Sequence, residues 1–226
     1  MKVRRQSLLS AILGMALFAG LCSPATADFI FDLNTPNVAI GGFAGPYGSV
    51  DVHLAGGIAT ITFTANSGFR FGDGGFVDAN VDTTFGAFSF VSCTENNGGG
   101  TGFSAGTCTD AGAGNVDGFK GFNQTTANTD GFADSAISAV LTLSGTWLDA
   151  ASVLTGNVDG WLAAAHIFVC TTVDSSGCVE SGGAIATGFA AGNGGGPGPE
   201  VPEPGSVALL GLGLVALALT RGRWNA

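Results

Sequence analysis

The sequence predicts an all-β fold, an antiparallel β-sandwich or a jelly-roll-like domain, on three observations. Glycine accounts for 39 of the 226 residues, well above its usual share of about 7%, and glycine disfavours helix interiors. No long amphipathic helix can be traced through residues 28–191. Instead the chain shows short alternating runs separated by Gly, Asn and Asp, which is typical of strands and turns.

Seven runs are expected to form strands, because apolar and polar residues alternate in them or because they are continuously apolar. They are residues 28–33, 49–55, 57–65, 85–92, 135–145, 163–172 and 183–189. In the second run, Asp51 and His53 alternate with valines, so His53 is expected to face water. The run around His166 is apolar on both faces and predicts a strand buried on both sides.

The first 27 residues have the three parts of a secretory signal peptide. A basic start is followed by a short apolar run, and Ala25 and Ala27 occupy the small-residue positions before a cleavage site. We therefore predict that signal peptidase removes residues 1–27 and that the mature chain begins at Asp28.

The other end predicts a single transmembrane helix. Residues 206–220 are almost wholly apolar, and Arg221 and Arg223 follow them. A helix of this length spans about 22 Å, so flanking residues would have to complete a hydrocarbon core of about 30 Å. Basic residues stay on the cytoplasmic side, which places the acidic body outside. Residues 192–200 are rich in Gly and Pro and are expected to form a linker.

A short motif, Pro202-Glu203-Pro204, directly precedes this apolar span. The order of this motif, the span and a basic tail with Arg221 and Arg223 resembles the PEP-CTERM sorting signal of Gram-negative bacteria. The resemblance covers residues 201–226 and implies recognition by an exosortase, a membrane cysteine transpeptidase that cuts near the motif. The stretch "GPYGSVDVHL" looks in addition like an ectodomain of unknown activity that recurs among PEP-CTERM proteins.

The charge of the expected mature body, residues 28–203, limits its partners. This segment holds all 17 acidic residues but only two basic ones, Arg70 and Lys120, so its formal charge is −15. Nucleic acids and anionic lipids are excluded as partners, because binding to phosphate requires clustered cations. Divalent cations suit such a surface well.

Four cysteines remain after removal of the signal peptide: Cys93, Cys108, Cys170 and Cys178. An even number in an exported chain predicts disulfides. Of the possible pairings we favour Cys93–Cys108 and Cys170–Cys178, because each closes a short Gly- or Ser-containing loop between expected strands. Each bond would then fasten a local loop rather than join distant sheets. A metal site is the alternative, but the sequence has no C-x-x-C and few histidines.

Three similar motifs recur at uneven spacing: "NVDGF" from Asn115, "NTDGF" from Asn128 and "NVDGW" from Asn157. Asp-Gly favours a two-residue turn, because both positions accept positive φ, and the aromatic residue would anchor the following strand. The alternative is a calcium site, since Asn and Asp provide the hard oxygen ligands that calcium prefers. The candidate ligands are Asp73, Asp78, Asp82, Asp117, Asp130 and Asp159. Beyond calcium, no cofactor is expected.

Catalysis is not expected. "GFSAG" around Ser104 matches G-x-S-x-G, and His166 with Asp149 or Asp159 follows in the order of a triad. However, a nucleophile elbow needs a strand before the serine and a helix after it, whereas loop-like residues flank Ser104. Trp147, Trp161 and Tyr47 are candidates for stacking on sugars, although large aromatic residues in strands usually belong to the core.

The sequence therefore predicts an exported surface or extracellular-matrix protein whose β-domain is structural or adhesive and not enzymatic. Its expected partners are signal peptidase, an exosortase and extracellular polysaccharide, with a transient anchor in the inner membrane and no nucleic acid. The alternative is a calcium-assisted carbohydrate-binding module. A hydrolase based on Ser104 is a third hypothesis, which labelling by a fluorophosphonate would test.

Overall fold

The computed structural model describes residues 28–72, 76–96, 106–128, 135–170, 173–174, 177–178 and 184–195. The predicted signal peptide, most of the predicted linker and the predicted C-terminal transmembrane helix lie outside these residues. Within them, no helix has the length and apolar character needed to cross a bilayer. The body of the protein forms a compact unit within residues 26–200.

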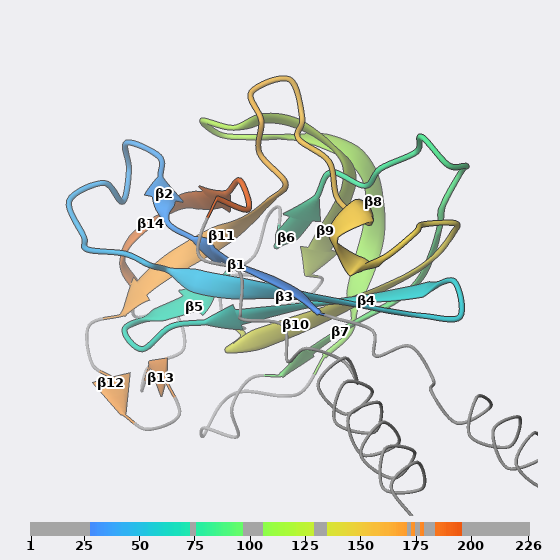
Figure 1. Cartoon of the computed structure of the whole chain (residues 1–226). Coiled ribbons are helices and arrows are strands. Elements are labelled where there is room, and N and C mark those ends of the chain that lie inside the picture. Colours follow the sequence, from blue (N-terminus) through green and yellow to red (C-terminus); the bar gives the residue numbers. More distant parts are fainter. Residues whose placement is uncertain are drawn as a thin grey trace, which may run out of the picture. The chain divides into compact units, whose positions relative to one another are not determined.

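The body is all-β and antiparallel, as predicted (Figure 1). One sheet has five strands, in the order β1 (Phe29–Leu33), β3 (Gly48–Ala55), β4 (Ile58–Ala65), β10 (Ser138–Ser144) and β7 (Ser89–Asn96). The turn between β3 and β4 is a two-residue hairpin in which Gly56 and Gly57 have φ values of 58° and 78°. Glycine is favoured there, because such a turn requires positive φ at both positions.

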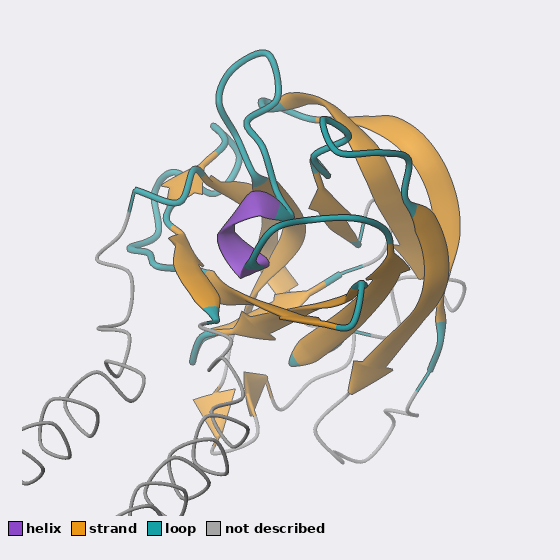
Figure 2. Cartoon of the chain, turned by 45° about the vertical axis from the view of Figure 1, so that its right-hand side comes forward, coloured by secondary structure: helices purple, strands orange, loops and turns teal. Residues whose placement is uncertain are grey.

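The second sheet has seven strands and contains most of the segments that the sequence did not predict. Its order is β2 (Thr35–Pro36), β14 (Ala184–Gly192), β11 (Ala163–Cys170), β6 (Val77–Ala79), β9 (Lys120–Asn128) and β8 (Cys108–Val116), and β5 (Phe69–Phe71) also pairs with β11. Two short strands, β12 (Val173–Asp174) and β13 (Gly177–Cys178), pair with each other. A single 3-10 turn, η1 (Ala150–Ser152), is the helical element of the described part (Figure 2).

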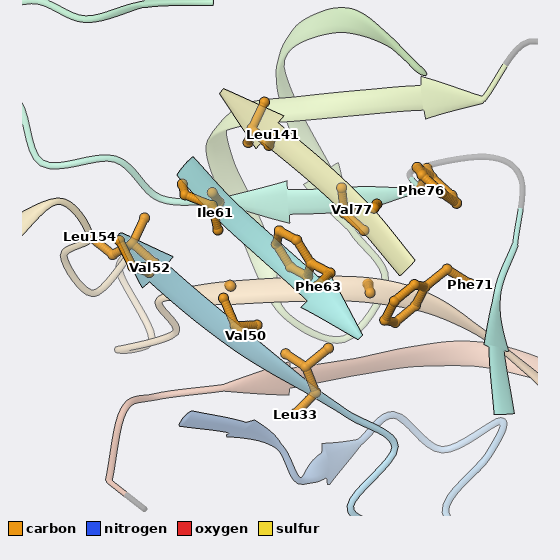
Figure 3. Packing of buried hydrophobic residues seen from close by; sticks show 14 of the residues in the cluster. Leu33, Val50, Val52, Ile61, Phe63, Phe71, Phe76, Val77, Leu141 and Leu154 are labelled. Carbon is orange, nitrogen blue, oxygen red and sulfur yellow. The ribbon is translucent and has the colours of Figure 1, made fainter. Parts of the chain in front are cut away.

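The main core lies where the inward faces of the two sheets meet. Val50, Ile61 and Phe63 of the first sheet share one cluster with Phe71 and Val77 of the second (Figure 3). The Phe71 ring packs edge-on against Phe63 at 6.3 Å between ring centroids, a favourable geometry for aromatic pairs. Strand β11 is buried along its whole length, as the sequence predicted.

A second, smaller cluster covers the other face of the seven-stranded sheet. The β8–β9 hairpin curves over β6 and β11 (Figure 1), and its residues Val116, Phe119 and Phe122 pack on Ala164 and Ala191. Residue 164 faces this cluster because side chains alternate along a strand and its neighbours in β11 point into the main core. The end of the hairpin thus covers part of the outer face of the sheet to which its own strands belong.

The first predicted disulfide is present, but its position corrects our expectation. Cys93 and Cys108 are bonded, with 5.0 Å between their Cα atoms, and both are buried. Cys93 lies in β7 of the five-stranded sheet and Cys108 in β8 of the seven-stranded sheet. The bond therefore joins the two sheets and does not merely fasten a local loop.

Cys170, at the end of β11, is also disulfide-bonded. The side chain of Cys178, its predicted partner, lies outside the part of the chain that the structure describes. The pairing Cys170–Cys178 therefore stays a prediction.

Candidate functional site

The tip of the β8–β9 hairpin is formed by the first of the recurring Asn-Val-Asp-Gly motifs. Val116 pairs with Lys120 across the tip, and the Phe119 N–H donates to the Val116 carbonyl at 3.0 Å. Gly118 has a φ of 87°, whereas Asp117 does not have a positive φ. These features match a type II turn, which requires glycine at its third position. The expected two-residue Asp-Gly hairpin is therefore wrong here, because three residues separate the paired ends.

The third motif forms a loop beside this hairpin. The Oδ1 atom of Asn157 accepts hydrogen bonds from the backbone N–H groups of Asp159 and Trp161, at 3.0 and 3.1 Å. Its Nδ2 atom donates across to the carbonyls of Phe119 and Gly121, at 2.8 and 3.1 Å. One amide side chain therefore shapes its own turn and fixes it to the hairpin.

The two motifs also meet through their aromatic residues. The rings of Phe119 and Trp161 pack edge to face, with 5.3 Å between centroids and an interplanar angle of 81°. We call residues 115–120 and 157–161 together the paired turns. The sequence shows the two copies of the motif, but not that they contact each other.

A third segment, which directly follows β2, supports the paired turns. Asn37 donates from Nδ2 to the Oδ2 atom of Asp117 at 3.0 Å, and its own backbone N–H donates to the Phe189 carbonyl at 2.8 Å. Val38 and Val158, which follow the two anchoring asparagines, are exposed. The result is a fixed platform of turns with polar and apolar groups at its surface.

Removal of the Asn157 amide should loosen the paired turns measurably. Asn157→Ala loses four hydrogen bonds, and we expect a loss of about 2 kcal/mol from the free energy of unfolding, since part-exposed bonds each contribute up to about 1 kcal/mol. Urea denaturation of the body measures this change. Asn80→Ala is the matched control, because the Asn80 side chain makes one exposed hydrogen bond, to the Thr155 carbonyl. Equal losses in the two variants would contradict the assigned role of Asn157.

The aspartates proposed as calcium ligands do not form one site in the described part of the chain. Asp82 accepts a hydrogen bond from the Thr84 N–H at 2.8 Å, and Asp117 is held by Asn37. Asp159 is exposed on the loop of the third motif. No group of three His, Cys, Asp or Glu side chains suited to a metal ion occurs among the described residues. Asp73 and Asp130 lie outside them, so calcium binding stays a prediction.

Asp78 differs from the other candidates, because it is completely buried. It lies opposite Ala164 and faces the smaller cluster, since its neighbours Val77 and Ala79 point into the main core. Neither carboxyl oxygen makes a hydrogen bond. Burial therefore raises the pKa of Asp78 well above its ordinary value, because the charged form loses its hydration without compensation.

A small group of ionisable side chains lies at the start of β1 and on the exposed face of β3. The Nδ1 atom of His53 is 2.6 Å from Oδ1 of Asp28, and both side chains are about half exposed. Burial, and then the charge of Asp28, raise the pKa of Asp51, whereas His53 lowers it. His53 faces water as predicted, and its pair with the expected first residue of the mature chain has the modest strength of an exposed ion pair.

The residues considered for catalysis or for stacking on sugars are mostly engaged elsewhere. His166 is buried and stacks on Phe189 at 4.6 Å between centroids. The carboxylate of Asp149 caps η1 by accepting from the Ser152 N–H, and Ser104 lies outside the described residues. Trp147 and Tyr47 are buried and belong to the core, so they cannot present faces to a glycan, whereas Trp161 is half-buried.

Comparison with known proteins identifies the tail of the chain. No curated protein and no solved structure matches this sequence. Residues 200–223 match the family model of the PEP-CTERM protein-sorting motif. They include the Pro-Glu-Pro motif and both arginines that suggested this signal. The chain is therefore a protein that carries a PEP-CTERM sorting signal, which directs exosortase-dependent export and sorting to the cell envelope.

Proposed function

We propose that the body is a non-catalytic structural and adhesive domain, displayed at the surface or in the extracellular matrix of a Gram-negative bacterium. The observation that carries the proposal is the combination of the sorting motif at residues 200–223 with a body whose sheets are joined by a buried disulfide. A disulfide of this kind suits a domain that works outside the cell. The acidic surface favours solubility among other exported molecules.

The route of export follows from the two ends of the chain. Signal peptidase removes residues 1–27, and the apolar span holds the body at the inner membrane until an exosortase acts at Pro202-Glu203-Pro204. The body then moves outward. The described strands end at Gly192, so cleavage near the motif leaves both sheets intact.

Processing should be visible in the mass of the mature protein. We expect a chain that begins at Asp28 and ends near the Pro-Glu-Pro motif in cells with an active exosortase. In cells that lack the enzyme, the same chain should keep residues 205–226 and remain in the membrane fraction. Intact-mass spectrometry of both fractions measures the difference, and Glu203→Ala should reproduce the uncut form. An unprocessed tail in competent cells would leave a simple membrane anchor.

Adhesion itself needs a separate test. Cells that lack the chain should bind less of their own exopolysaccharide, and the purified body should restore this binding when added back. Unchanged attachment would rule out the adhesive role. A body that takes up a fluorophosphonate label, with the label lost in Ser104→Ala, would instead indicate a hydrolase.

Calcium-assisted carbohydrate binding is the second candidate function. It is favoured by the exposed position of Asp117 and Asp159 on the paired turns. Binding of the body to exopolysaccharide in calcium, and its loss in EDTA, would establish this form of the function. Binding that is equal in both buffers would exclude the role of calcium and keep adhesion.

A further inference from the structure

An open hollow of about 490 Å³ lies at the tip of the β8–β9 hairpin. It is lined by Asn115, Val116, Asp117, Gly118 and Lys120. Three of these residues carry polar side chains, and all three are exposed. The hollow thus offers an ammonium, an amide and a carboxylate within one small area of the paired turns.

The backbone at Lys120 is unusual. Its φ is 66°, and it is the one residue other than glycine with positive φ among the described residues. This left-handed conformation is unfavourable for residues with a Cβ atom, and glycine adopts it freely. Glycines stand nearby at positions 118 and 121, in a chain that is rich in them. The fold alone would therefore favour glycine at position 120, so lysine stands there at a cost in backbone energy.

The charge distribution makes this lysine more distinctive. The only other basic residue between positions 28 and 203 is Arg70, which is buried and donates from Nη2 to the Ser135 carbonyl at 2.7 Å. Lys120 is therefore the only exposed lysine or arginine of an otherwise acidic body. An anionic group that approaches the hollow meets a lysine ammonium group there.

Asp117 limits which anion can enter. Its carboxylate lines the same hollow and is partly stabilised by the Asn37 amide at 3.0 Å. If the ligand carried a second negative charge besides the one that pairs with Lys120, Asp117 would repel that second charge. A hydroxyl group of the ligand could instead donate a hydrogen bond to the Asp117 carboxylate. The hollow is thus suited to a ligand with one negative charge and several hydroxyl groups.

We propose that the hollow binds a carboxylate-bearing sugar, that is, a uronic acid unit of an acidic polysaccharide. This inference rests on the adhesive function proposed above and assigns its site. The Lys120 ammonium pairs with the sugar carboxylate, while Asn115 and Asp117 bind its hydroxyl groups. The hydrogen bonds from Asn37 and Asn157 hold the turns in place before the ligand arrives, which lowers the entropic penalty of binding.

Calorimetry on the body, residues 28–200, tests the site, because both large sheets and both core clusters lie within this segment. The probes are a galacturonic acid oligosaccharide, a galactose oligosaccharide of equal length and inorganic phosphate, all in EDTA to exclude bridging calcium. We expect the acidic sugar to bind most tightly. Lys120→Met should weaken it by about tenfold or more, and Lys120→Arg should restore it.

Each outcome bears on a different part of the proposal. Equal binding of the acidic sugar by wild type and Lys120→Met would overturn this site and leave the adhesive function standing. Phosphate bound as tightly as the acidic sugar would overturn the sugar class. If the body binds none of the probes, the site is refuted, and the whole-cell attachment assay decides separately on the adhesive function. A matching thermal midpoint in Lys120→Met excludes misfolding as the cause of lost binding.

Discussion

Replacement of Cys93 and Cys108 by alanine should lower the free energy of unfolding by about 3 kcal/mol, the value expected for a bond that closes a loop of this length. The two cysteines are separated by 15 positions in sequence, and the bond restricts the unfolded chain. For a domain of this size the midpoint of thermal unfolding should fall by about 6–12 °C. Urea and thermal unfolding of the double variant provide the measurement.

The position of the bond adds a second expectation. Because β7 and β8 belong to different sheets, hydrogen exchange in the variant should increase first along these two strands and later in β11. As a control, the double variant is unfolded with and without reductant. The difference gives the contribution of the Cys170 disulfide to stability, which can then be told apart from that of Cys93–Cys108. A loss below about 1 kcal/mol would show that packing alone holds these strands together.

Asp78→Asn should stabilise the body at neutral pH by about 1–3 kcal/mol, because the wild type must keep an unpaired carboxyl group protonated or bury its charge. The folded pKa of Asp78 lies above the unfolded value, so the folded state binds the proton more tightly. Wild-type stability is therefore greatest below the unfolded pKa, near 3.8, and falls as pH rises toward the folded pKa. The asparagine variant should match the wild type in acid and exceed it at neutral pH.

Chemical denaturation at a series of pH values measures this difference. Asp159→Asn is the matched control, because it removes the same charge from an exposed position. Asp51, whose pKa is also raised, contributes a smaller slope of the same sign in all three proteins. If Asp78→Asn keeps the full wild-type slope, the carboxyl group has a partner or water in solution.

The sequence predicts best those strands in which the alternation of apolar and polar residues matches the alternation of buried and exposed side chains. The runs that became β3, β4 and β10 alternate apolar and polar residues, and each places one face in the core. The prediction for β7 was displaced, because residues 85–92 alternate equally well while the strand begins at Ser89. An extra residue at Val91 also interrupts its register with β10, and such bulges cannot be read from alternation.

The sequence does not predict the strands β8 and β9, because they lack a clear alternation of apolar and polar residues. In β9, polar side chains take part in the pairing. β9 is rich in polar residues, and its side chains extend the pairing with β6 beyond the backbone ladder. Asn123 bonds the N–H and the carbonyl of Val81, and the Thr126 hydroxyl does the same for Val77. Buried polar residues that satisfy a neighbouring backbone resemble a loop in sequence.

The sequence predicts the separate turns of the candidate site, but not that these turns contact each other. The Asn-Val-Asp-Gly motifs predicted turns, and turns are present at both described copies. Nothing local indicates that Phe119 packs on Trp161 or that Lys120 adopts positive φ, because both depend on how the hairpin curves over the sheet. The disulfide is a similar case. The short spacing predicts the correct pair, Cys93 and Cys108, but it does not show that the bond joins two different sheets.

The contact between the beginning and the end of the described body has a practical consequence for engineering. A Cβ atom built on Gly194 would lie 3.0 Å from the Phe29 ring, so the two ends of the folded body are neighbours. Domains with adjacent ends tolerate insertion into a host loop and circular permutation. A short peptide joining residue 195 to residue 28, with new ends opened in the β3–β4 turn next to the exposed Gly56, should give a permuted protein with the same two sheets. This body could therefore be grafted as a guest module into unrelated scaffolds.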